Sequence, residues 1–249
     1  MKRIRYYSSY EDDFIESKNQ EYKIPDGYRW IRNDALSRIL STLIYGAAVI
    51  FGSIYSFLHL RLRYKERKKL RGALIFGNHT QPVGDIFIPA LASLPTGIYV
   101  VVSPANYGIP IIGRLLPYLG ALPLSDTLSG TRKLSEAIGE HLRKGKNVVI
   151  YPEAHVWEYY TGIRPFSESS FRFAVKFRAP VYCTTVTYKK GRFGKRPKTE
   201  VFIDGPFYAG ETLGAKAAAK KLRDEVYETM RKRSENSTYE YIEYKKREN

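Results

Sequence analysis

A histidine and an aspartate in one short segment have the residue types needed to move a proton. His79 and Asp85 are separated by a stretch that contains a proline and a glycine, and an apolar run begins at Asp85. On one continuous helix, six positions at about 100° each would place the two side chains on different faces. They meet only if His79 lies in a loop before the helix, and the proline and glycine favour such a loop.

The expected chemistry of this pair is general base catalysis. An aspartate that accepts a hydrogen bond from one imidazole nitrogen fixes the tautomer and leaves the other nitrogen basic. No serine or cysteine stands beside the pair in the context of a nucleophile elbow. The base would therefore activate a hydroxyl that the substrate brings.

Short β-branched runs alternate with amphipathic stretches from residue 73 onward, and several of the runs are apolar throughout, as buried strands are. The predicted strands are residues 73–77, 98–103, 121–124, 147–151, 181–188 and 199–205. Helices are predicted from residue 85 and over residues 131–145, 171–178 and 213–233. This alternation predicts an α/β fold with layered helices and a sheet, in which the strand at 73–77 delivers His79 to its loop.

An uncharged segment precedes this domain. Residues 39–58 contain no charged side chain, and a helix of that length would be about 30 Å long, the thickness of a bilayer core. The alternative is a buried helix of a soluble fold. Seven Lys and Arg residues against one Glu follow in residues 61–71, and such a basic run binds anionic headgroups on the cytoplasmic side. We therefore predict a protein of the cell membrane whose catalytic domain is on the cytoplasmic face.

Five regions follow from these patterns. They are a polar, irregular or partly ordered leader (1–35), a membrane helix (36–60), a basic juxtamembrane segment (61–71), an α/β domain (72–210), and a C-terminal helix with a charged tail (211–249).

The composition limits the classes of partner and cofactor. Lys and Arg number 41 against 25 Asp and Glu, a formal net charge of +16, which suits nucleic acid, anionic lipid or phosphorylated small molecules. Cys183 is the one cysteine, so an intrachain disulfide and a cysteine-based zinc site are excluded. A metal site made of His79, His155 and Asp85 is a minor alternative, and no metal is predicted.

Four blocks of the sequence resemble, in order, the signature blocks of the glycerolipid acyltransferases, the group of 1-acyl-sn-glycerol-3-phosphate (lysophosphatidic acid) acyltransferases. GNHTQPVGD resembles the first block, YGIPIIGRLLPYLGALPL the second, NVVIYPEAH the third and RAPVYCTTVTY the fourth. IRPFSESSFRFAV resembles the stretch between the third and fourth blocks, and the resemblance covers roughly residues 70–208. It implies a glycerolipid-acyltransferase-like α/β domain, in which His79 is the catalytic base and Asp85 its partner.

The chain departs from the family pattern in three places. Five residues rather than four separate His79 from Asp85. The third block keeps the glutamate, Glu153, and lacks the arginine that follows in the family. The second block ends in Ser125 and Asp126, where the family has an arginine for the phosphate of the acceptor.

These departures leave the substrate-binding residues open. We expect Glu153 at the substrate site and favour Arg164 as the replacement phosphate cation, with Arg132 and Lys133 as other candidates; an ordinary ion pair is the alternative for Arg164. We expect His155 to contact substrate in place of a family threonine, or to lie beside Glu153 or Trp157.

Asn78 is a further candidate, either steadying the loop or helping to bind the oxyanion. The apolar segment 109–119 is expected to receive the acyl chain.

The resemblance implies an O-acyltransferase that moves a fatty acyl chain from acyl-CoA or acyl-carrier protein to a lysophospholipid hydroxyl, above all 1-acyl-sn-glycerol-3-phosphate, in phospholipid biosynthesis. It implies membrane lipid as a partner and no cofactor. A non-catalytic lipid-binding protein of the same fold is the alternative, suggested by the altered third block. No nucleic-acid partner is predicted, because the positive charge is concentrated beside the apolar helix. The patterns do not predict the oligomeric state.

Overall fold

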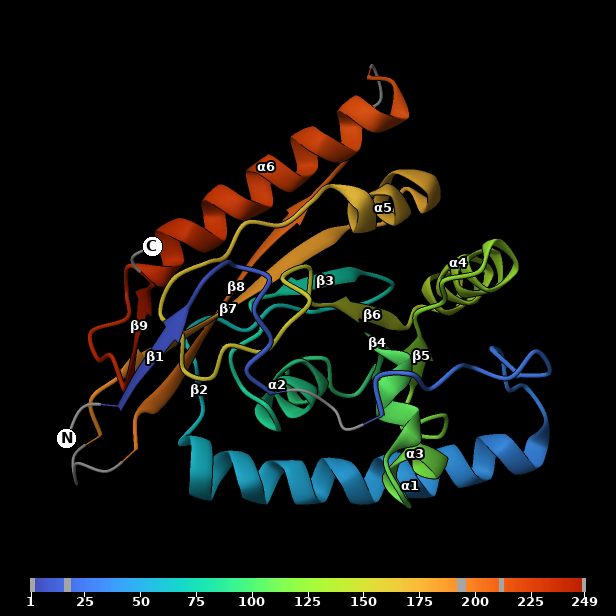
Figure 1. The fold of residues 1–249 in the computed structure, drawn as a ribbon. Coiled ribbons are helices and arrows are strands. Elements are labelled where there is room, and N and C mark those ends of the chain that lie inside the picture. The colour runs from blue at the N-terminus through green and yellow to red at the C-terminus, as the bar shows by residue number, and fades with distance from the viewer. Residues whose placement is uncertain (1–2, 16–18, 192–195, 211–212, 248–249) are drawn as a thin grey trace.

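A seven-stranded sheet forms the centre of the protein in a computed structural model that describes residues 3–15, 19–191, 196–210 and 213–247 (Figure 1). The strands lie in the order β2-β8-β7-β3-β6-β4-β5, and only the β7–β8 pair in this sheet is antiparallel. Their bounds are β2 Arg63–Tyr64, β3 Leu74–Gly77, β4 Ile98–Val102, β5 Ala121–Pro123, β6 Asn147–Ile150, β7 Val181–Lys189 and β8 Lys198–Phe207. All six strands predicted from the sequence are present, so the α/β prediction is confirmed.

Helices cover both faces of the sheet (Figure 1). One face packs against α4 (Leu128–Arg143), α5 (Arg172–Phe177) and α6 (Ala215–Ser234) through a core that includes Phe76, Ile138 and Leu222. The other face packs against α2 (Gly84–Ala92) through a second core that includes Ile75 and Ile88. Short helices η2 (Pro104–Gly108), α3 (Ile112–Leu115) and η3 (Ser169–Phe171) complete the connections. The central strand β3 is apolar throughout because both of its faces are buried.

The apolar N-terminal helix α1 (Ala35–Tyr55) continues into the π-turn η1 (Ser56–Leu60). Asp34 begins the helix by accepting a hydrogen bond from the Ser37 N–H at 2.9 Å. The helix lies along the domain beneath α2 (Figure 1), and Gly52 packs so closely on the Phe87 ring that a side chain would not fit there. Its outward side is apolar and exposed: Leu36, Ile39, Leu43, Ile50, Phe51, Ile54, Phe57 and Leu58.

By length and composition, residues 35–60 are sufficient to cross a membrane, and 17% of their most apolar window is buried inside the protein. A core helix of a soluble fold would be mostly buried. The exposure of α1 therefore argues against that alternative.

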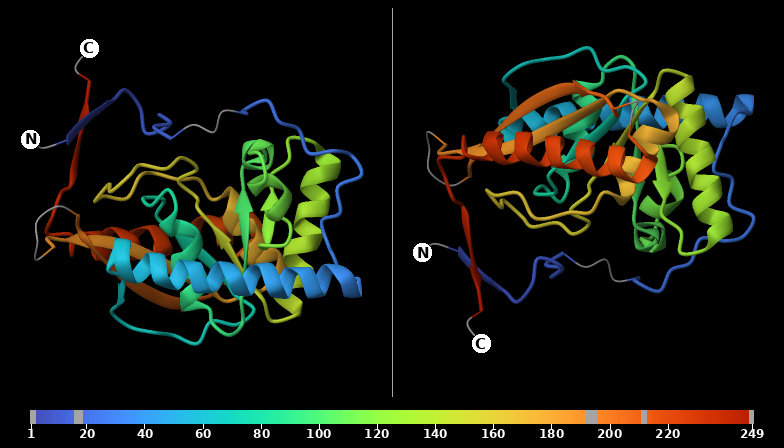
Figure 2. Two further views of the ribbon diagram at one scale, coloured as in Figure 1. Left: turned by 90° about the horizontal axis from the view of Figure 1, so that it is seen from below. Right: turned by 90° about the horizontal axis from the view of Figure 1, so that it is seen from above.

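Both ends of the chain contribute to a second, two-stranded sheet. β1 (Arg3–Tyr7) pairs in parallel with β9 (Ile242–Lys246), and Figure 2 shows the two strands side by side. The sequence predicts neither strand, since it indicates an irregular or partly ordered leader and a charged tail. The reason is physical: each strand is short and largely polar, and each is ordered by a partner at the opposite end of the chain.

The basic segment also has internal contacts that the sequence does not predict. Within it, β2 pairs with β8 at the edge of the large sheet. Lys65 forms an ion pair with Glu200 at 2.8 Å, and the Lys68 amine donates to the Gly205 carbonyl at 2.6 Å. Part of its positive charge is therefore used to hold the sheet edge.

Candidate active site

Polar side chains gather where the neighbouring strands β3 and β6 end. Asn78 and His79 follow β3 directly, and Glu153 follows β6 by three positions. Because these strands are parallel neighbours, their carboxyl ends meet at one edge of the sheet, where open α/β folds bind ligands. Gly77 is needed at this point, since a Cβ there would lie 2.7 Å from the Tyr151 ring.

The structure brings His79 and Asp85 together. His79 Nδ1 lies 2.7 Å from Asp85 Oδ2, which also accepts a hydrogen bond from the Gln81 N–H at 2.9 Å. His79 is in the loop and Asp85 in the first turn of α2, where the positive end of the helix dipole favours a carboxylate. The loop of five residues between them therefore permits the pair.

The two side chains differ in their access to solvent. The His79 side chain is 20% exposed, whereas that of Asp85 is 3% exposed. Burial raises the pKa of the Asp85 carboxyl above its ordinary value, and the hydrogen bonds from His79 and Gln81 act against this rise. With Nδ1 bonded to Asp85, Nε2 is the nitrogen left for a substrate.

Tyr151 holds the plane of the imidazole. Its ring stacks on that of His79 with centroids 4.4 Å apart and an interplanar angle of 17°, and its hydroxyl donates to the Asp85 carbonyl. Sequence reasoning missed this residue, although an aromatic residue directly before Pro152 and Glu153 is a usable signal. Tyr151 thus contacts both members of the pair.

The Asn78 side chain, directly after β3, is hydrogen-bonded to the main chain of β7. Its side-chain amide donates to the Val186 carbonyl at 3.0 Å, and its oxygen accepts from the Val186 N–H at 2.8 Å. The residue is 1% exposed, so the structure gives it the loop-steadying position. Its part in substrate binding stays a prediction.

Glu153 and Arg164 form a buried ion pair. Arg164 Nη2 lies 3.2 Å from Glu153 Oε2, and the two side chains are 1% and 0% exposed. The carboxylate also accepts the Arg164 N–H at 2.9 Å and the His79 N–H at 3.1 Å, so it anchors the base loop. Burial raises the pKa of Glu153, and the Arg164 guanidinium opposes the rise.

The structure places Arg164 in the interior of this loop. Its guanidinium donates to the carbonyls of His155 and Tyr10, lies 4.9 Å from the centroid of the Trp157 ring, and presents no face to solvent. A phosphate ligand would need an accessible guanidinium, and in this structure Arg164 is instead an interior residue of the loop. We predicted that Glu153 contacts the substrate. In this structure its carboxylate accepts hydrogen bonds from protein N–H groups.

The other predicted substrate residues lie apart from the base. His155 pairs with Asp13 of the leader, Nδ1 to Oδ2 at 3.1 Å. Arg132 lies on α4 with a side chain that is 74% exposed and 3.7 Å from Glu136. Lys133 lines a separate cavity of about 730 Å³ with Ser125 and Asp126. Among the described residues, hydrogen bonds thus join His79, Asp85, Glu153 and Arg164 into one network, which His155 reaches only through its main-chain carbonyl. Asn78 is next to His79 in the chain and bonds to Val186.

Both chain ends reach this network through Trp157, a contact that sequence reasoning missed. The Trp157 N–H of the main chain donates to the His79 carbonyl at 3.0 Å, and its indole N–H donates to the Asp12 carbonyl at 2.8 Å. Its ring stacks on Tyr244 of β9 with centroids 4.9 Å apart, and Tyr7 of β1 lies against it at 4.9 Å. The small terminal sheet therefore covers the loop that carries Glu153.

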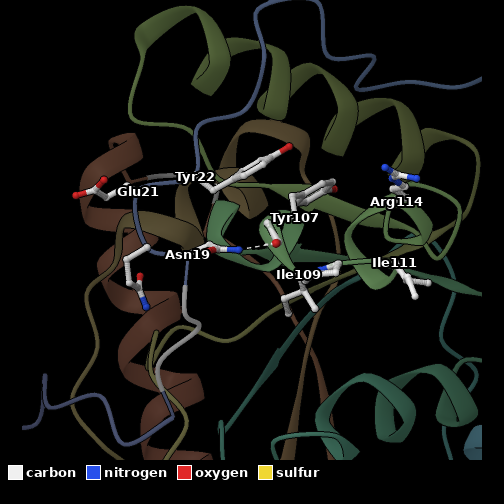
Figure 3. Close-up of a pocket in the computed structure, with 10 residues that line it drawn as sticks. Asn19, Glu21, Tyr22, Tyr107, Ile109, Ile111 and Arg114 are labelled. Atoms are coloured by element: carbon white, nitrogen blue, oxygen red, sulfur yellow. Dashed lines mark hydrogen bonds between the residues drawn. The ribbon is translucent and has the colours of Figure 1, made fainter.

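The segment expected to receive an acyl chain lines an open cavity of about 960 Å³ (Figure 3). Ile109, Ile111 and Arg114 come from this segment, and Asn19 and Tyr22 come from the leader. Ile111 is 76% exposed. Because the leader contributes polar residues to this cavity, its lining is mixed rather than apolar.

No group of three or more His, Cys, Asp or Glu side chains that could hold a metal ion occurs among the residues that the structure describes. His155, a member of the minor metal alternative, pairs with Asp13 instead.

Comparisons with known proteins give one family match and one likeness in fold. The family model described as Acyltransferase matches residues 59–189, more than half of the chain, and this range contains His79, Asp85 and Glu153. The crystal structure of the 1-acyl-sn-glycerophosphate (LPA) acyltransferase PlsC from Thermotoga maritima superposes with a TM-score of 0.52 at 19% identity, covering 82% of this chain and 97% of that one. At that identity the likeness concerns the fold. No curated protein sequence matches the chain.

Proposed function

Because this chain belongs to the acyltransferase family, we propose that it transfers a fatty acyl group from a thioester, acyl-CoA or acyl-carrier protein, to the hydroxyl of a lysophospholipid, with 1-acyl-sn-glycerol-3-phosphate as the first candidate. The observation that carries this proposal is the His79–Asp85 pair, with one imidazole nitrogen bonded and the ring partly exposed. The similarity in fold to a PlsC described as an LPA acyltransferase supports the choice of acceptor.

In this proposal His79 is the general base, a role that its bonded Nδ1 and partly exposed ring support. Nε2 takes the proton of the acceptor hydroxyl as its oxygen attacks the thioester carbonyl, and the C–S bond then breaks. The proton passes from the imidazolium to the departing thiolate, so that an ester and a free thiol leave the site. No acyl-enzyme forms, and the step needs neither a metal nor a redox cofactor.

Asp85 supports the charge that forms on the ring. When the imidazole gains a proton, its partner is a carboxylate 2.7 Å away in a buried setting, where the attraction is stronger than in water. The hydrogen bond also fixes Nδ1 as the protonated nitrogen of the resting base. Tyr151 keeps the ring in the plane that this hydrogen bond requires.

The exposed side of α1 supports membrane association. Its outward residues are apolar, and the charged side chains of residues 61–71 follow directly, most of them exposed. A helix that presents such a face beside basic residues binds an anionic membrane surface. We place the protein on the cytoplasmic face of the cell membrane, where a lysophospholipid is at hand.

Thiol release tests the proposal directly. Purified full-length protein in detergent is given palmitoyl-CoA or an acyl-carrier-protein thioester, with and without lysophosphatidic acid, and the free thiol is measured. We expect release that depends on the acceptor and is lost in His79→Ala. Release from neither donor, with lysophosphatidic acid or with a panel of other lysophospholipids, would contradict the proposal and favour a non-catalytic lipid-binding protein.

A further inference from the structure

A third cavity, which we call the strand-start cavity, lies beneath the amino-terminal half of α1 and has a volume of about 830 Å³. Ile98, the first residue of β4, and Lys146, just before β6, line it. Since β3, β4 and β6 run parallel, this is the edge of the sheet opposite to His79. Figure 1 shows this half of α1 extending beyond α2. It contacts the domain through Tyr45, whose hydroxyl accepts a hydrogen bond from the Ile98 N–H at 3.3 Å.

Cations dominate the lining of the strand-start cavity. Arg32, Arg38, Lys144 and Lys146 line it, and no Asp or Glu does. Lys146 donates to the Thr96 carbonyl at 2.8 Å, which leaves its charge unpaired. Arg38 is exposed, and its guanidinium has no partner among the described residues.

Lys144 is the one of these cations with a nearby carboxylate. Its amine lies 2.6 Å from Glu140 and 2.8 Å from the side-chain oxygen of Asn33. The balance at the cavity is therefore strongly positive, and the charge can attract an anion.

A buried polar atom on the same wall lacks a partner. His141 is 4% exposed, and its Nε2 is buried without a hydrogen bond among the described residues. Its ring stacks on Tyr99 with centroids 3.5 Å apart. Burial first, and Lys144 second, lower the pKa of His141 to about 4, so the ring is neutral at pH 7. Unsatisfied buried polar atoms are rare, and this one belongs to a residue that lines the same cavity as the cations.

Part of the remaining wall is apolar. Val49, Leu94 and Ile98 line the cavity beside polar residues such as Ser41 and Thr42, and a Cβ built on Gly46 would meet nothing within 4 Å. Arg38 and Val49 lie eleven residues apart on α1, about 16 Å along its axis. Cations and apolar side chains in one cavity match a molecule that carries both a phosphate and a hydrocarbon chain.

We propose that the strand-start cavity binds an anionic phospholipid, with its phosphate near Arg38 and Lys144 and one chain along Val49. Free inorganic phosphate shares the charge but would leave the apolar wall uncovered. The exposed apolar side of α1 gives a membrane lipid a direct route into the cavity. This site is separate from the proposed acyl-transfer site, since the two lie at opposite edges of the sheet.

Binding is measured on the full-length protein in a neutral detergent. The probes are dioctanoyl-phosphatidylglycerol, dioctanoyl-phosphatidylcholine, dioctanoylglycerol and inorganic phosphate, each followed by the shift in Tm and by direct titration. We expect dioctanoyl-phosphatidylglycerol to bind and raise Tm, and the other three to bind at least about tenfold more weakly.

Two variants test the two ends of the cavity. Arg38→Glu should raise the Kd for dioctanoyl-phosphatidylglycerol by about tenfold or more, because a charge-assisted contact becomes repulsive. Lys220→Glu is the matched control, since it changes charge equally on the exposed face of α6 and should leave the Kd unchanged. Gly46→Leu should fill the apolar end and weaken binding without lowering Tm, because Gly46 has free space around it and glycine is a poor helix former.

The following results would overturn the proposal. Equal effects of Arg38→Glu and Lys220→Glu would mean that binding follows net charge alone. Equal binding of inorganic phosphate would assign the cavity to free phosphate, and equal binding of dioctanoylglycerol would make the cations irrelevant. Loss of acyl transfer in Gly46→Leu would make the cavity part of the substrate path. Lipid binding does not depend on turnover, so failure of the acyltransferase proposal leaves this test intact.

Discussion

Two pairs, each of one carboxylate and one basic side chain, follow the ends of neighbouring strands and differ in what their polar atoms contact. His79–Asp85 follows β3, and its imidazole is 20% exposed with one nitrogen unbonded. Glu153–Arg164 follows β6, and its side chains are 0% and 1% exposed, with the carboxylate fully engaged. The first pair is arranged to exchange a proton with a ligand, and the second to fix the loop that carries the first. The difference lies in access, since both pairs are close and hydrogen-bonded.

The strongest test of this comparison is the base itself. His79→Ala should lower kcat by about 10²- to 10⁴-fold, because proton transfer to a positioned base is lost. Its Tm should fall modestly, since the buried Asp85 loses one hydrogen-bond partner and keeps the Gln81 N–H. Steady-state thiol release and thermal unfolding measure the two effects. The control is His59→Ala, a histidine on η1 that contacts Arg196, which should keep its activity.

The second test breaks the buried pair. Glu153→Gln leaves Arg164 as an uncompensated charge in the interior, so the free energy of unfolding should fall by about 3–5 kcal/mol. Urea denaturation measures this loss. Glu136→Gln is a matched change in an exposed pair with Arg132 and should cost less than about 1 kcal/mol. If Glu153→Gln kept its stability and lost only turnover, the glutamate would act on the substrate and the comparison would be wrong.

The buried His141 differs from both pairs, because the charged side chains nearest to it are mostly positive, as the protonated imidazole would be. Tyr99, Glu140, Lys144 and Lys146 surround His141, whose pKa is lowered to about 4. The unfolded chain binds a proton near pH 6.5 and the folded one near pH 4, so stability is lost as the pH falls between these values. By pH 4.5 the loss should reach up to about 3 kcal/mol.

His141→Phe should remove this pH dependence. Urea denaturation at pH 7 and pH 4.5 compares the variant with the wild type, and the difference between the two pH values should shrink in the variant. An unchanged difference would mean that His141 is protonated in the folded protein.

The smallest expected effect concerns the ring that supports the base. Tyr151→Phe removes the hydroxyl that donates to the Asp85 carbonyl and should cost about 1 kcal/mol of stability, with kcat nearly unchanged. Tyr151→Leu also removes the stack on His79 and should lower kcat several-fold while KM stays constant. A fall in Tm of equal size in both variants, with equal kcat, would give Tyr151 a purely structural role.

The parts of the fold that the sequence predicts carry their own local signal. The strands at β3 and β6 are runs of buried β-branched and apolar residues, and they were expected within a residue or two of their observed ends. The sequence does not predict β1 and β9, because each strand is hydrogen-bonded to the other and the two are separated by nearly the whole chain. Local pattern does not report such a partner.

The site also combines contacts that a local sequence pattern predicts with contacts to residues far away in the chain. His79 and Asp85 were predicted because six positions and a loop bring them together, which is local geometry. The burial of Arg164 depends on Tyr10 and Trp157, and Trp157 is covered in turn by both chain ends. The sequence around Arg164 does not indicate these distant partners, so it does not predict that the side chain is buried.

The pairing of β1 with β9 sets an order on biosynthesis. A nascent chain emerges with its amino end first, so β1 stays without its partner until residues 242–246 have been made. Closing so long a loop is slow and comes late in folding. The cover over Trp157 therefore forms only after β9 has been synthesised, later than the strands that carry the base loop.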